Sequence, residues 1–191
     1  MMIDYNAITA IAAVLAVVIA TTAIIVEGKR SRIRQGIDLI IRLNEFFSYN
    51  KDFKRTRRAA GAFLRRIQNQ SGQKRGKNKR RKSSIFISEG SVELGEVLDF
   101  FQLIAVMVRK NALDEDIAWN FYGYYLEGYL LLSRNYIDFC RQSSPDYWED
   151  VDWMYKLFVK IEKKESTIGY KMLSPEELQS FINDECRLNT D

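Results

Sequence analysis

The composition of this 191-residue chain excludes several classes of function. The sequence contains no histidine, which removes the commonest general acid–base, the commonest zinc ligand and every nucleophile–histidine pair. Its two cysteines, Cys140 and Cys186, are too few for a disulfide scaffold or a metal set, and no glycine-rich phosphate loop occurs. We therefore predict a protein that is not an enzyme, with no catalytic residue, no cofactor and no metal.

The net charge of +4 conceals a strong polarity along the chain. Residues 27–84 carry 19 Lys and Arg against four acids, whereas residues 85–191 carry ten against 20. We predict four parts: a short periplasmic N-terminus at 1–6, a transmembrane helix at 7–26, basic juxtamembrane helices with a disordered polybasic loop at 27–84, and an acidic helical domain at 85–191.

The apolar run at residues 7–26 predicts the transmembrane helix, because it has 20 residues without a charge, about the length that spans a bilayer. A cleaved signal peptide is the alternative, but no Lys or Arg precedes the run. Small residues spaced four apart would allow close approach of two such helices. The residues that we assign to the anchor are Ile8, Ala12, Ala16, Ala20 and Val26.

Basic residues follow the anchor immediately and predict its direction, since an excess of Lys and Arg marks the cytoplasmic side. We expect these and later basic residues to contact anionic lipid or another anion. Specific nucleic-acid binding is disfavoured, because the basic run at 74–82 has no aromatic residue on which a base could stack. The predicted contact residues are Lys29, Arg30, Arg32, Arg34, Arg57, Arg58, Arg65, Arg66, Lys79, Arg80 and Arg81.

Helical spacing of apolar residues recurs after the anchor. The first pattern covers Ile33, Ile37, Ile40, Ile41, Asn44 and Phe47, with a break at 49–52. The second has Phe53, Ala60, Phe63, Leu64 and Ile67 on one side and Arg55, Arg57, Arg58, Arg65 and Arg66 around the rest. Residues 68–84 lack any hydrophobic side chain, and we predict a disordered loop there.

Capping signals delimit the later helices. Residues 91–109 form one helical pattern, and Asp114 is placed to cap a central helix that runs from Ile117 toward residue 141. Ser144 followed by Pro145 predicts another helix start. Ser174, Pro175 and Glu177 form a capping box before a last helix near 175–187. The predicted fold is all-α, with one transmembrane helix followed by a cytosolic bundle of about five to six helices.

Residues 94–158 resemble a family of small bacterial proteins that is described only as a domain of unknown function. The residues that carry this resemblance are Leu98-Asp99-Phe100-Phe101, Ala105 to Arg109, Leu113-Asp114, Phe121, Tyr129 and Tyr147-Trp148. The resemblance implies an N-terminal membrane helix and a cytosolic helical domain, and hence the inner membrane of a bacterium, but no activity.

Two further groups of residues have a structural and a functional interpretation. The aromatic series Trp119, Phe121, Tyr122, Tyr124, Tyr125 and Tyr129 is more typical of a core or an oligomer interface than of a pocket for a planar ligand. The acids Asp146, Glu149, Asp150 and Asp152 match no calcium pattern and are more typical of a solvated helix start.

We expect a non-enzymatic, membrane-anchored module that binds another protein or, by self-association, itself. The alternative is a membrane effector, for instance in phage defence, in which a small anion such as a nucleotide bridges Arg57, Arg58, Arg65 or Arg66 of several subunits. A hidden enzyme is disfavoured because no catalytic constellation is present in the sequence.

Overall fold

The structure is a computed structural model that describes residues 27, 34–72, 86, 88–165 and 171–189. Its described residues form six helices and no strand, which confirms the all-α class. The helices are 34–49, α2 (Lys51–Gly72), α4 (Ser91–Arg109), α5 (Glu115–Arg141), α6 (Glu149–Glu165) and α7 (Pro175–Cys186).

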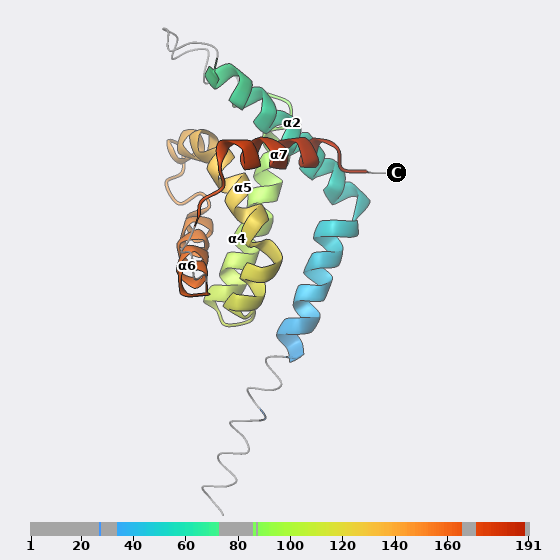
Figure 1. The fold of residues 1–191 in the computed structure, drawn as a ribbon, viewed down its shortest axis with the longest axis vertical. Helices are drawn as coiled ribbons and strands as arrows, with labels where there is room; N and C mark the ends of the chain where they lie inside the picture. Colours follow the sequence, from blue (N-terminus) through green and yellow to red (C-terminus); the bar gives the residue numbers. More distant parts are fainter. Residues whose placement is uncertain (1–26, 28–33, 73–85, 87, 166–170, 190–191) are drawn as a thin grey trace, which may run out of the picture.

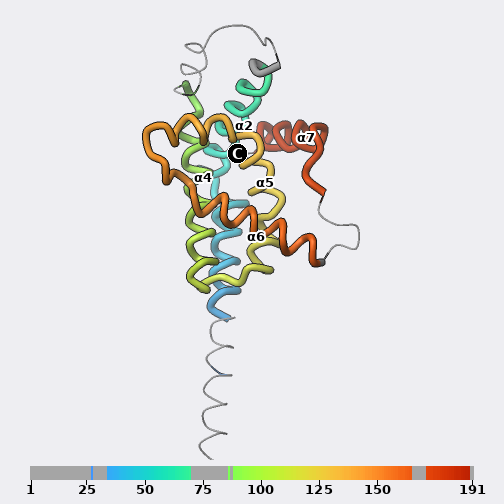
Figure 2. Tube along the Cα trace, turned by 90° about the vertical axis from the view of Figure 1, so that its left-hand side faces the viewer, coloured from blue at the N-terminus to red at the C-terminus, as the bar shows by residue number. Residues whose placement is uncertain are grey.

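The helices pack around α4 and α5, which lie side by side in the middle of the domain (Figure 1). Helix 34–49 lies along one side of this pair. From its end α2 runs diagonally past the upper end of the pair, where it packs on α4, and α7 crosses α2 and α5 there. Figure 2 shows α6 running obliquely across α4 and α5, both of which it contacts. The arrangement makes α4 and α5 jointly central, rather than α5 alone as the sequence predicted.

One hydrophobic core joins the segments on both sides of the predicted boundary at 84/85. Phe47 from helix 34–49 and Phe63 from α2 are buried in the same cluster as Leu98 and Phe101 of α4. Residues 34–72, which we predicted to precede the acidic domain as basic juxtamembrane helices, thus share this core, because α2 packs directly on α4 and α7. A fragment of residues 85–191 would lack α2, so the surfaces of α4 and α7 that pack on α2 would be exposed to water.

Helix 34–49 buries only part of its predicted apolar stripe. Ile40 and Phe47 are 2% and 1% exposed, whereas Ile37 and Ile41 are 41% and 48% exposed. Asn50 then ends this helix and caps the next, because its Oδ1 accepts a hydrogen bond from the backbone N–H of Phe53 at 2.8 Å. The predicted break at 49–52 is thus confirmed as a bend between two consecutive helices.

Two predicted helix starts are confirmed by their capping hydrogen bonds. The Asp114 carboxylate accepts from the backbone N–H groups of Asp116 and Ile117 at 3.0 and 3.1 Å. Ser174 and Glu177 form the reciprocal capping box, which satisfies two amides that the helix itself leaves unpaired.

The predicted start of α6 at Ser144 and Pro145 is wrong, because the helix begins only at Glu149. Trp148 adopts a left-handed backbone conformation with φ of 53° just before the helix. Its indole is 6% exposed and donates a hydrogen bond to Asp99 Oδ1 at 2.7 Å. This tertiary contact holds Trp148 out of a helical conformation and delays the helix by one turn.

Helix α7 approaches α2 and α5 closely because glycines lie beneath it. A Cβ at Gly61 would lie 2.9 Å from the Glu185 Cβ, and one at Gly128 would lie 2.8 Å from the ring of Phe181. Both distances are below van der Waals contact, so α7 can dock in this position only where these two residues have no side chain.

Replacing Gly128 with alanine is expected to lower the free energy of unfolding by about 1–3 kcal/mol, since the added methyl overpacks the interface with Phe181. Gly95→Ala is the matched control, because its Cβ would find only ordinary contacts at 3.8 and 3.9 Å. That change should stabilise α4 by up to about 1 kcal/mol through helix propensity. Denaturant unfolding of the two variants checks the prediction, and equal effects would contradict it.

Candidate functional site

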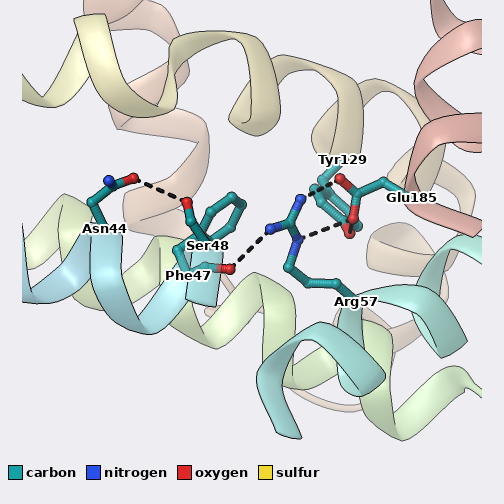
Figure 3. Close-up of polar contacts among 6 residues, drawn as sticks. All are labelled: Asn44, Phe47, Ser48, Arg57, Tyr129 and Glu185. Atoms are coloured by element: carbon teal, nitrogen blue, oxygen red, sulfur yellow. Dashed lines mark hydrogen bonds and ion pairs between the residues drawn. The ribbon is translucent and has the colours of Figure 1, made fainter. Parts of the chain in front are cut away.

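A buried ion pair lies where helix 34–49, α2, α5 and α7 meet (Figure 3). Arg57 lies on the inner face of α2, four residues after Phe53 and three before Ala60, and is only 3% exposed. Glu185 of α7 is 2% exposed and opposite to it. Two charges have thus been removed from water, which is favourable only if each is well paired.

The geometry of the cluster pairs both charges. Arg57 Nε donates to Glu185 Oε2 at 3.0 Å, and its Nη2 donates to Oε1, so the pair is bidentate. Arg57 Nη1 donates to the Phe47 carbonyl oxygen at 2.9 Å. The Tyr129 hydroxyl donates to Glu185 Oε2 at 2.5 Å. The contacts connect four helices through one guanidinium and one carboxylate.

Aromatic rings surround the guanidinium. Arg57 Cζ lies 3.8 Å from the centroid of the Phe47 ring and 5.1 Å from that of Tyr125, within the range of cation–π attraction. Beside this cluster, Ser48 donates a hydrogen bond to Asn44 Oδ1 at 3.1 Å, one turn earlier in the same helix (Figure 3). The end of helix 34–49 is consequently held by both apolar and polar contacts.

Electrostatics keep Arg57 and Tyr129 each in one protonation state. Burial disfavours the charged form of Arg57, but the hydrogen bond and charge of Glu185 outweigh it, and the pKa of Arg57 is raised. Burial, together with the Glu185 carboxylate, raises the pKa of Tyr129 well above its usual value. Tyr129 therefore remains a neutral hydroxyl that donates to the carboxylate.

The burial of Arg57 corrects its assignment to the lipid- or anion-contacting residues, because its guanidinium faces the core and is paired there. Of the other predicted contacts, Arg34 and Arg58 are exposed. Arg65 donates to Asn183 Oδ1 at 2.8 Å, and Arg66 donates to the Glu89 carbonyl oxygen. The predicted contacts Lys29, Arg30, Arg32, Lys79, Arg80 and Arg81 lie outside the described residues.

The anchor residues Ile8, Ala12, Ala16, Ala20 and Val26 also lie outside the part of the chain that the structure describes. Within the described part, no helix combines the length and the apolar character needed to cross a membrane.

The acids near the start of α6 form ion pairs. Asp150 pairs with Arg109, and Asp152 pairs with Arg134 and Arg141 at 3.0 and 2.7 Å. These pairs join α6 to α4 and α5. The described residues contain no group of three or more potential metal ligands.

A cavity of about 340 Å³ lies between α5, α6 and the segment before α7. Residues one turn apart on α5 form one wall, residues three or four apart on α6 form the other, and residues 171 and 173 close one side. The lining residues are Trp119, Asn120, Gly123, Tyr124, Glu127, Tyr155, Phe158, Val159, Glu162, Lys171 and Leu173.

The predicted aromatic series divides between the core, this cavity and the surface, where Phe121 is 42% exposed. Tyr122 and Tyr129 are fully buried, and Tyr125 packs against the core cluster, as the core interpretation predicted. Trp119 and Tyr124 instead line the cavity. We did not predict this cavity from the sequence, although Glu127 follows Trp119 by two helical turns, a spacing that places both on one face of α5.

The fold and its buried cluster define a helical-bundle domain without a recognisable catalytic centre among the described residues. The chain matches the family model of a domain of unknown function, DUF4760, over residues 10–158, and it belongs to that family. No curated protein and no solved structure matches the chain. The matched region ends before α7, so Glu185 comes from a helix beyond it.

Proposed function

We propose that this protein is a single-pass protein of the bacterial inner membrane whose helical domain lies in the cytoplasm and acts by binding, without catalysis. The observation that carries the proposal is the uncharged run at 7–26 followed at once by Lys29, Arg30, Arg32 and Arg34. The family match begins at residue 10, so it takes in most of this run.

Helix 34–49 packs against the core of the domain. This packing supports the proposal that the domain is held next to the membrane anchor. Phe47 packs against rings of α4 and α5, with centroids 5.2 Å from Phe100 and 4.8 Å from Tyr125. Its carbonyl oxygen is bound by Arg57. The first described helix, which follows the basic residues in the sequence, is therefore part of the packed domain. We propose that the basic residues before it contact anionic headgroups.

The anchor is tested by extracting membranes that contain the full chain with alkaline carbonate. We expect the full chain to stay with the membranes, and a variant lacking residues 7–26 to be released. A reporter fused after residue 191 should be active only in its cytoplasmic form. Release of the full chain by carbonate, or reporter activity in the periplasm, would overturn the proposal.

Self-association is the second part of the proposal, and exposed apolar side chains favour it. Ile37 and Ile41 lie one turn apart on helix 34–49 and are 41% and 48% exposed. Crosslinking in membranes should capture a homo-oligomer, and replacing both residues with lysine should reduce it. Gln35→Lys is the control, because it introduces the same side chain at an exposed position on another side of the same helix. Only monomers in the unaltered protein would contradict this part.

No observation favours the alternative of an anion-triggered effector. Its proposed anion site includes Arg57, which is buried, and Arg65 and Arg66, which already bind groups of this chain. Thermal stabilisation of the full chain by nucleotides, abolished by Arg58→Glu, would support that alternative.

A further inference from the structure

The cavity between α5 and α6 has the size of a small-ligand site. Its 340 Å³ lies at the lower end of the range of ligand pockets, about 300–1,000 Å³. At about 30 Å³ per water molecule, it has room for a small organic molecule and is far larger than a bare metal ion needs.

Among the described residues, two carboxylates and one ammonium are the charged groups that line the cavity. Glu127 comes from α5, Glu162 from α6 and Lys171 from the segment before α7. Glu127 is 9% exposed and also accepts a hydrogen bond from the Leu173 backbone N–H at 3.4 Å. The resulting balance is one negative charge in a partly desolvated space, where electrostatic attraction for a cation is stronger than in water.

Aromatic side chains provide the other half of the site. Trp119, Tyr124 and Tyr155 line the cavity together with Phe158. The Trp119 ring lies over Gly123, where a Cβ would be only 3.2 Å from its Cδ1, so the absence of a side chain at 123 makes room for the indole. Aromatic faces beside carboxylates attract alkylated ammonium groups, which are cationic and apolar at once.

We propose that this cavity binds a small monovalent organic cation with an alkylated ammonium group, held by the rings of Trp119 and Tyr155 and by the charge of Glu162. The ligand's single positive charge balances the excess carboxylate. The site does not depend on membrane attachment.

The electrostatics of the cavity lining agree with this assignment. Burial, and then the charge of Glu127, raise the pKa of Glu162. A bound cation would favour the charged carboxylate, so affinity should be highest above that raised pKa and should fall as the pH drops through it. The other titratable groups among the lining residues are Glu127, Lys171, Tyr124 and Tyr155.

The test is calorimetric titration of the full chain in detergent with choline and with 3,3-dimethylbutan-1-ol, its uncharged analogue of the same shape. We expect choline to bind saturably and at least about tenfold more tightly than the analogue. Equal binding of the two compounds, or no saturable binding of choline, would overturn the proposal.

Charge variants make the test specific. Glu162→Gln should weaken choline binding about tenfold or more, whereas Glu149→Gln, at an exposed position on the same helix, should leave it unchanged. Lys171 lines the cavity but is exposed, and its ammonium repels a cationic ligand. Lys171→Met should therefore tighten choline binding severalfold. If Glu162→Gln fails to fold, Lys171→Met still decides, because unchanged or weaker binding in that variant would overturn the proposal.

The alkylated ammonium group that we propose could belong to a lipid headgroup or to a free organic cation. A second experiment separates these two sources. The choline titration is repeated in phosphatidylglycerol nanodiscs with and without phosphatidylcholine. Loss of the calorimetric response only in the discs with phosphatidylcholine would identify a headgroup as the occupant, and retention in both would identify a free cation. Either result supports the site, whereas absence of a response in both would overturn it.

Discussion

Replacing Glu185 with alanine is expected to lower the free energy of unfolding by about 3–5 kcal/mol, because Arg57 would remain buried without its carboxylate. Tyr129 would also lose its hydrogen-bond acceptor. Denaturant unfolding of the full chain in detergent, followed by tryptophan fluorescence, measures the loss.

The neighbouring residue supplies the control for this variant. Asp184→Ala removes an exposed carboxylate from the same helix and should change stability by no more than about 0.5 kcal/mol. The double variant Arg57→Met, Glu185→Leu removes both charges, and it should recover much of the loss. A double variant as unstable as Glu185→Ala alone would show that the unpaired charge is not the cause.

Replacing Phe47 with alanine should cost about 3–5 kcal/mol, the range for a large aromatic residue removed from a core. Phe47 is 1% exposed and contacts the rings of Phe100, Phe101, Tyr122 and Tyr125. The same change also removes the aromatic face beneath the Arg57 guanidinium.

Phe46 is the matched control, since it is the preceding residue and has the same side chain. Phe46 is 44% exposed, and its ring contacts the rings of Phe53 and Phe100. Phe46→Ala should therefore cost about 1 kcal/mol. Similar losses in the two variants would contradict the burial pattern of helix 34–49.

The features predicted correctly from the sequence are those set by neighbouring residues. The caps at Asp114 and Ser174 depend on amides two or three residues away, so the spacing of side chains was enough to place them. The break at Asn50 has the same origin.

The features that were missed depend on residues far apart in the chain. The start of α6 is displaced by a hydrogen bond between Trp148 and Asp99, 49 positions apart. Arg57 was placed on the exposed side of its helix, although its spacing from Phe53 and Ala60 put it on the apolar face. Its partner lies 128 positions later, and no local pattern indicates that pairing.

The long separation between Arg57 and Glu185 has a consequence for synthesis on the ribosome. At about 5–20 residues per second, the 128 positions between them take about 6–26 s to translate. During that time the arginine has been made and its carboxylate has not. The nascent domain can complete its interior only after α7 has emerged, so a product truncated before α7 would expose an unneutralised cation and an open apolar surface to proteases.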